Sequence, residues 1–324
     1  MATMTEPLSS TSPVTPFHEY HAEAHVLSGR LERPVEQVIE PHAPIQLKGR
    51  RGGHLTRAAQ EINIEGVVTF KKGSTRVSGS VSRKHHGWVT LSTSIVEGLN
   101  VFEVITADRI VSQVSTEHPP KDGHIPHVTF IGSQFENLRV SGFPVALTLD
   151  YGACGEKPEG DRSYLREPSF LEKAYERTGK IAEELAKSPD LPAGLADEYA
   201  GRLGVIKTLI ASCNGDGDVD PNAKVTCSIV KNIDVELGKS TIPGLRVIEN
   251  VIVIPAFGWV ALGEVEVGTE LYEPTSYSKT TAASASARSI SNYFHLKMAD
   301  MHLGCVGHGN VSAGNAKSNG QSYP

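Results

Sequence analysis

The chain has 324 residues with a formal net charge of −6, and 39% of its residues are hydrophobic while 21% are charged. This apolar content is enough to offset the entropy of ordering, so we expect one or two folded domains rather than a disordered chain. The acidic balance provides no broad positive field, which argues against a nucleic-acid partner.

Residues 1–16 are rich in Ser, Thr and Pro and are expected to form a flexible arm. They lack the basic start and apolar run of a secretory signal, and no later segment approaches the ~18 apolar residues of a transmembrane helix. The cytoplasm is therefore the default location. There the four cysteines, Cys154, Cys213, Cys227 and Cys305, would be reduced thiols, whereas an oxidising compartment would allow a Cys154–Cys213 disulfide.

Residues 17–150 have the composition and alternation of β-strands. The four larger side chains of residues 89–95 share one face of an expected half-buried strand, and Thr90, Ser92 and Ser94 share the other. Residues 101–115 are rich in β-branched side chains, and residues 145–149 alternate again. We interpret residues 17–150 as the first half of a β-sandwich.

The composition changes at residues 151–224, which we expect to form a helical insertion that ends in an Asp/Gly loop. Ser169 and Glu172 follow Pro168 with the spacing of a capping box, which predicts the start of one helix. A second helix is expected after residues 188–190, with Pro192 in its first turn. The two helices would form an antiparallel hairpin.

Strand patterns return in residues 225–316, the expected second half of the sandwich, and a short tail follows at residues 317–324. In the last strand the apolar parity changes near Asp300, which predicts a bulge or bend there. No repeat of fixed period is present. The fold class predicted is mainly β, an antiparallel β-sandwich or jelly roll with an inserted helical hairpin.

Histidines supply two candidate metal sites. The loop EHPPKDGHIPH presents His118, His124 and His127, and three converging imidazoles would bind zinc or copper, although histidines beside Pro and Gly are commonly just solvated. His302, Cys305 and His308 form a second string that would need a turn to converge. The crowded His18, His21 and His25 are explained more simply as a polar strand edge.

An acidic stretch resembles the middle of a calcium-binding loop. Its oxygen-bearing side chains fall on alternate residues, with glycines between them, at Asn214, Asp216, Asp218 and Asp220. The positions that would carry the first and last ligands are Ser212 and Ala223, so no carboxylate closes the loop at either end. An Asp/Gly turn is the alternative explanation.

Catalytic motifs are absent from the sequence. There is no nucleophile elbow, phosphate-binding loop, zinc-protease helix or dinucleotide fingerprint, and the Asp and Glu residues are too numerous to nominate an acid and a base. No cofactor beyond a possible zinc or calcium ion is suggested. These observations favour a protein that is not an enzyme.

Several stretches resemble an uncharacterised bacterial β-rich family whose layout is similar to the choice-of-anchor P domain. They are GWVTLSTSIVEGLNVFEVITADRIVSQVSTEHP at 87–119, FENLRVSGFPVALTLD at 135–150, and, in the later half, VTCSIVKNI, IPAFGWVALGEVEV and FHLKMADMHLGC. The resemblance implies a secreted or surface β protein. It supplies no catalytic residue to carry over.

Three functions remain open from the sequence. The leading hypothesis is a structural β-sandwich protein that acts by self-association as a homo-oligomer, or by binding a surface partner, through exposed strand edges. The second is a metal-dependent enzyme or small-ligand-binding protein with a His-lined site. The third is a carbohydrate-binding module that would use Trp88, Trp259 and some of the nine tyrosines.

Overall fold

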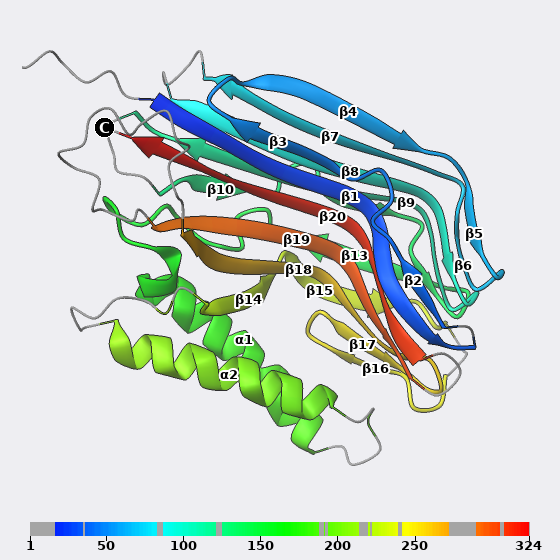
Figure 1. Ribbon diagram of the computed structural model, residues 1–324. Helices are drawn as coiled ribbons and strands as arrows, with labels where there is room; N and C mark the ends of the chain where they lie inside the picture. The colour runs from blue at the N-terminus through cyan, green and yellow to red at the C-terminus, as the bar shows by residue number, and fades with distance from the viewer. Residues whose placement is uncertain are drawn as a thin grey trace, which may run out of the picture.

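The computed structural model describes residues 17–34, 36–82, 87–120, 125–187, 191, 194–213, 220, 222–238, 242–271, 290–304 and 308–323. Two antiparallel sheets lie face to face, and two helices cover part of the outer side of one of them (Figure 1). The predicted β-sandwich with a helical insertion is therefore confirmed. No helix in these ranges has the length and apolar composition to cross a membrane.

The first sheet, sheet A, carries the helices. Its strands follow the order β16 (Arg246–Ile248), β17 (Val251–Ile254), β18 (Gly258–Leu271), β19 (Ile290–Leu303), β20 (His308–Tyr323), β1 (Phe17–Arg33) and β2 (Gln37–Ile39). In addition, β14 (Lys224–Ser228) pairs with β18, and β3 (Ile45–Gly49) pairs with β1.

The second sheet, sheet B, packs against the inner face of sheet A. Its order is β15 (Val230–Val235), β13 (Phe143–Leu149), β12 (Arg139–Val140), β9 (Ile105–His118), β8 (Trp88–Val101), β6 (Val68–Phe70) and β5 (Ile62–Ile64). Three further strands branch from this path: β10 (His127–Thr129) and β11 (Gln134–Glu136) pair with β9, and β7 (Lys72–Val81) joins β8 to β4 (Gly53–Ala59).

The first and last strands of the described chain are neighbours. β1 and β20 pair from Phe17 opposite Tyr323 to Arg33 opposite His308. Residues 317–323, which we expected to form a tail, thus belong to a strand in the middle of sheet A. Two small side chains of this segment and its approach, Ala316 and Ser318, are fully buried.

The buried face of β8 is its polar face. Thr90, Ser92 and Ser94 are completely buried between the sheets, while Leu91 and Ile95 are only half-buried on the outside. The Ser94 hydroxyl donates to the carbonyl of His25 in β1 at 2.8 Å, and the Ser92 hydroxyl donates to that of Glu23. Small hydroxyl side chains here let the two sheets approach closely and connect them directly.

The parity change predicted near Asp300 is present two residues earlier. Met298 and Ala299 are both fully buried, and Met298 has no directly opposite partner in either neighbouring strand. Gly263 in β18 and Gly314 in β20 flank it with positive φ angles of 59° and 67°. All three strands therefore bend at the same level, and Asp300 lies on the outer face, where it accepts a hydrogen bond from Lys297 at 2.9 Å.

A short 3₁₀ turn, η1 (Tyr164–Arg166), leads into the hairpin of α1 (Pro168–Ala186) and α2 (Leu195–Ser212). The predicted capping box is wrong: Glu167 is the N-cap of α1, and the Ser169 hydroxyl donates to its carboxylate instead of capping an amide. The helices pack on β17 and β18 through an apolar cluster of Ile181, Leu185, Leu195, Tyr199, Val251, Val253, Trp259 and Ala261.

Candidate functional site

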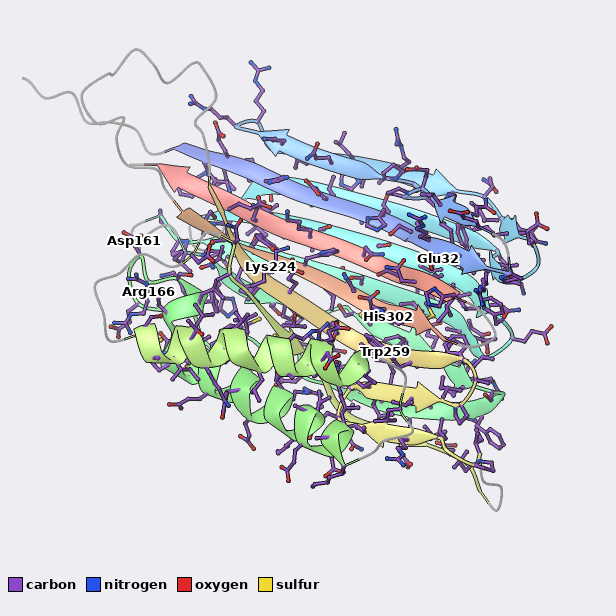
Figure 2. The ribbon with its side chains drawn as sticks, turned by 60° about the horizontal axis from the view of Figure 1, so that its bottom comes forward. Glu32, Asp161, Arg166, Lys224, Trp259 and His302 are labelled. Carbon is purple, nitrogen blue, oxygen red and sulfur yellow. The ribbon has the colours of Figure 1, made fainter. Side chains whose placement is uncertain are left out.

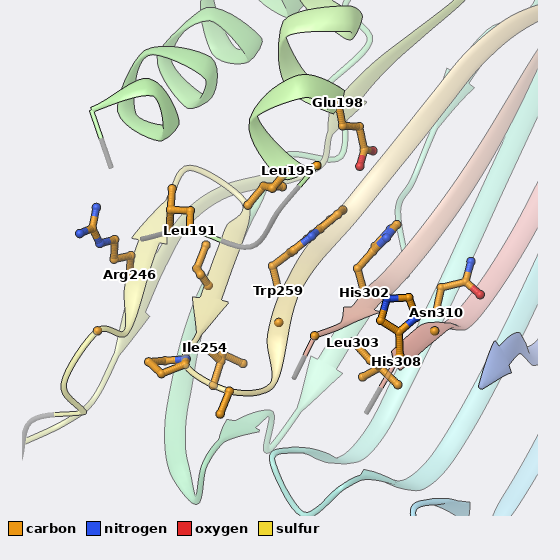
Figure 3. A pocket seen from close by; sticks show the side chains of 18 of the residues that line it. Leu191, Leu195, Glu198, Arg246, Ile254, Trp259, His302, Leu303, His308 and Asn310 are labelled. Atoms are coloured by element: carbon orange, nitrogen blue, oxygen red, sulfur yellow. The ribbon is translucent and has the colours of Figure 1, made fainter. Parts of the chain in front are cut away.

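An open groove of about 1080 Å³ lies at one end of sheet A. It lies between the start of α2 and the adjacent ends of β16 to β20 and β1. Figure 3 shows its lining at close range, and Figure 2 shows Trp259, His302 and Glu32 at this end of the sheet, with Lys224 farther along it. A volume of this size is typical of small-molecule sites.

A stacked pair of rings forms the floor of this groove. Trp259 of β18 and His302 of β19 lie directly opposite each other in the register, and their ring centroids are 3.8 Å apart with an interplanar angle of 9°. Trp259 is only 4% exposed, because the helical hairpin covers it from the other side. The ring that a ligand would contact most directly is therefore that of His302.

The two sides of the groove differ in chemistry (Figure 3). One side is mostly apolar, with Leu191, Leu195 and Ile254, and it carries Arg246 and Glu198 at its margins. The opposite side presents His302, His308 and Asn310. Arg30 and Glu32 of β1, the strand paired with β20, also line the groove. A groove with one mostly apolar and one polar side suits a ligand that has both kinds of surface.

Most charges at the groove already have partners within the protein. His308 Nδ1 lies 2.5 Å from a Glu32 carboxylate oxygen, and Arg30 Nη2 lies 3.2 Å from a Glu36 oxygen. Glu198, at the α2 side, accepts a hydrogen bond from Arg202 at 2.6 Å. The groove thus lacks the concentration of one charge that would select a strongly anionic or cationic ligand.

A polar strip runs along the outer face of sheet A, on the same face as the ring of His302. One row of directly opposite residues runs from Glu266 through His295 and Lys317 to Glu23. A second row joins Glu264, Lys297, Asn315 and His25. Residues opposite each other share a face of the sheet, so the side chains of each row lie side by side.

Burial keeps two histidines of this strip neutral. It lowers the pKa of His25 to about 4, and it also lowers the pKa of His295 to about 4, with Lys297 adding to the effect. Removing a cationic imidazolium from water is unfavourable, which is why both rings stay uncharged down to about pH 4. These rings offer hydrogen-bonding nitrogens rather than positive charge.

The predicted site at His118, His124 and His127 is not brought together. His127 lies opposite Glu117 in the β10–β9 register, so it shares the exposed face of Glu117, whereas His118 points to the other face and is completely buried. The ring of His118 lies 4.6 Å from that of His18 between the sheets. His124 lies outside the described residues.

The second histidine string is partly assembled. His302 and His308 line the same groove, but Cys305 lies outside the described residues. In the calcium-like stretch, Asn214, Asp216 and Asp218 also lie outside them, and Asp220 accepts a hydrogen bond from the Asn222 amide in a turn. Within the described ranges no three His, Cys, Asp or Glu side chains are placed to hold a metal ion.

The N-terminal histidines divide between the two faces of β1. His21 and His25 lie on the polar strip, where His21 Nε2 is 2.7 Å from a Glu23 oxygen, while His18 points between the sheets and stacks on Trp88. Trp259 is buried, so it offers no bare ring to solvent, whereas Trp88 is half-buried and carries His18 on one face. The sequence motifs had identified His302, His308 and Trp259, but not the apolar side of the groove.

Comparison with known proteins gives a family but no described relative. Neither the curated proteins nor the solved structures include a match to this chain. The profile of Domain of unknown function (DUF8256) matches residues 18–268, which is more than half of the chain and includes sheet B, the helical hairpin and β18 as far as Gly268. The match does not test the resemblance to the choice-of-anchor P domain, which stays a prediction. The chain belongs to the DUF8256 family.

Proposed function

We propose that this protein is a binding protein that holds a small amphipathic ligand in the groove between α2 and the end of sheet A. The observation that carries the proposal is the stacked Trp259–His302 pair at the floor of a cavity of about 1080 Å³. Shape, an aromatic floor and two chemically different sides are the usual features of a preformed small-molecule site.

The groove is built on rigid elements. Trp259 and His302 come from the paired strands β18 and β19, and Leu195 is fixed in the apolar cluster beneath the hairpin. Side chains held this way lose little freedom when a ligand binds, so contact area is converted into affinity efficiently.

The test uses 8-anilinonaphthalene-1-sulfonate as an amphipathic probe and Trp259 as the reporter. Because the chain has two tryptophans, a Trp88→Phe background leaves Trp259 alone in the emission spectrum. A probe bound in the groove should quench Trp259 by energy transfer with a saturable, one-site dependence. In that background we expect His302→Ala and Asn310→Phe, which remove the ring and narrow the groove, to weaken binding at least fivefold.

The matched control is His127→Ala, an exposed histidine on the face of Glu117 in sheet B that should bind the probe unchanged. Native mass spectrometry of gently purified protein provides an independent measurement, since a retained small molecule should be missing from Asn310→Phe. The proposal would be wrong if His302→Ala, Asn310→Phe and His127→Ala bound the probe with equal affinity and if the purified protein retained no small molecule.

A second candidate function, self-association, is favoured by strand β4. Six of its seven residues are exposed, Leu55 is 44% exposed, and among the described strands β4 pairs only with β7. An open strand edge can pair with the same edge of a second copy. Light scattering across a concentration series should then show a dimer in the wild type and a monomer in Leu55→Lys.

The control for that experiment is Val205→Lys, which places the same charge at an exposed apolar residue of α2. If the wild type is monomeric at every concentration, or if both variants remain dimeric, pairing through β4 is excluded.

A further inference from the structure

Two cysteines that are distant in sequence lie against each other at the base of the helical hairpin. Cys154 follows β13 in a turn, Cys227 lies in β14, and their Sγ atoms are 4.0 Å apart although 73 positions separate them. Both side chains are free thiols. The pairing raised by the sequence joined Cys154 to Cys213, but the thiol that contacts Cys154 is that of Cys227.

The backbone holds these two segments together independently of the thiols. The amide of Asp150 donates to the carbonyl of Ile229 at 2.6 Å, and Leu149 lies opposite Val230 in the β13–β15 register. Arg177 of α1 adds a contact from the helix side, since its guanidinium donates to the carbonyl of Ser228, at 3.2 Å, and to that of Val230. The cysteines are therefore kept close by the fold, which is the condition for a disulfide to form with little rearrangement.

We infer that Cys154 and Cys227 are a disulfide-forming pair that links the helical insertion's two ends when the protein meets an oxidising thiol–disulfide environment. The bond would close the chain around both α1 and α2. It would fasten the base of the hairpin whose other end forms a side of the groove, but it does not depend on the ligand proposal.

The two thiols have different parts in the exchange. Cys154 is 1% exposed, and its contact with Cys227, together with burial, raises its pKa well above the ordinary thiol value. Cys227 is half-buried and is the thiol that an oxidant reaches first. Its thiolate attacks a small-molecule disulfide, which releases one thiol and leaves a mixed disulfide on Cys227.

In the second step Cys154 loses its proton and its sulfur attacks Cys227 Sγ, which releases the second small thiol. In the net reaction, two protein thiols and one small-molecule disulfide become one protein disulfide and two small-molecule thiols. Two electrons pass from the protein to the small-molecule disulfide.

The experiment equilibrates the native full-length protein with glutathione disulfide and then maps disulfides by mass spectrometry after alkylation of free thiols. We expect a Cys154–Cys227 linkage, with two of the four thiols lost. The linkage should also form in Cys213→Ser and be absent from Cys227→Ser. Oxidised wild type should melt about 5 °C higher than reduced wild type, because the bond closes a long loop in the unfolded chain.

Cys213→Ser is the matched control, since it removes a partly buried cysteine of the same insertion. A linkage of Cys154 to any other cysteine, or two thiols that remain reduced after oxidation with a large excess of glutathione disulfide, would overturn the inference. The wild-type map alone decides this even if a serine variant folds poorly.

Discussion

Two tryptophan–histidine stacks lie at different places in this fold and have different surroundings. His18 stacks on Trp88 at a centroid distance of 5.3 Å with an angle of 10°, and His302 stacks on Trp259 at 3.8 Å with an angle of 9°. The first stack lies between the sheets beside buried His118, while the second forms the floor of an open groove. Similar ring chemistry is thus structural in one place and available to a ligand in the other.

The largest expected effect is the pH dependence of stability, to which His18 of the inner stack contributes together with His25 and His295 of the polar strip. Burial lowers the pKa of His18 to about 2, and His25 and His295 have pKa values of about 4, against about 6.5 when unfolded. Because the unfolded chain binds these protons first, their stabilising contribution is complete above pH 6.5 and is lost as the pH falls. We expect a loss of about 2 kcal/mol per histidine by pH 5 in urea denaturation.

The His18→Phe variant tests how much of this loss of stability at low pH comes from the inner stack. Phenylalanine retains a ring against Trp88 but cannot bind a proton, so stability should fall less steeply between pH 6.5 and pH 5 than in the wild type. An unchanged slope would mean that His18 is not held neutral between the sheets.

The next effect is the cost of removing a ring. His118 is completely buried, so His118→Ala should leave a cavity and reduce the free energy of unfolding by about 3 kcal/mol. His302→Ala removes a ring from the edge of an open groove and should cost about 1 kcal/mol. Denaturant titration of both variants measures the difference, and equal losses would contradict the distinction between the two stacks.

A smaller effect is expected from crowding the inner stack. A Cβ atom at Gly320 would lie 2.7 Å from His18 Nε2 and 3.1 Å from His118 Cε1, so Gly320→Ala should cost about 2 kcal/mol. Gly201→Ala in α2 is the matched control, since nothing lies within 4 Å of its Cβ position, and it should stabilise by up to about 1 kcal/mol. Thermal melting of the two variants should shift in opposite directions.

The smallest effect is expected at the polar side of the groove. The His308–Glu32 pair is exposed, with 61% and 47% of the side chains accessible, so His308→Ala should change stability by less than about 0.5 kcal/mol. If calorimetry showed a loss comparable to that of His118→Ala, the groove histidines would be structural as well.

The amino-acid pattern predicts the architecture, but it does not predict which face of each strand is buried. Alternation over residues 89–95 correctly indicated a strand, but the buried side carries Thr90, Ser92 and Ser94, because their hydroxyls and small size allow contact with β1. No rule of hydrophobic alternation contains that information, since the partner strand is about 70 positions away.

The groove shows the same limit. The spacing of His302 and His308 is visible along the chain, but the ring of Trp259 reaches His302 only through the β18–β19 register, and Leu195 comes from the helical insertion. The predicted convergence of His118 and His127 failed for a related reason, because neighbouring strands turned those two side chains to opposite faces. Pairing between distant segments therefore determines both that the groove forms and that His118 and His127 are kept apart.

The pairing of β1 with β20 has a consequence for synthesis. β19 and β20 lie between β18 and β1, so sheet A stays divided until the last described residues emerge from the ribosome. Strands β4 to β13, by contrast, follow one another closely and can assemble sheet B early. During translation, the nascent chain would hold a nearly finished sheet B and a strand β1 that is paired with β2 and β3 on one edge but still lacks β20 on the other. That open edge is what a chaperone would have to shield in this interval.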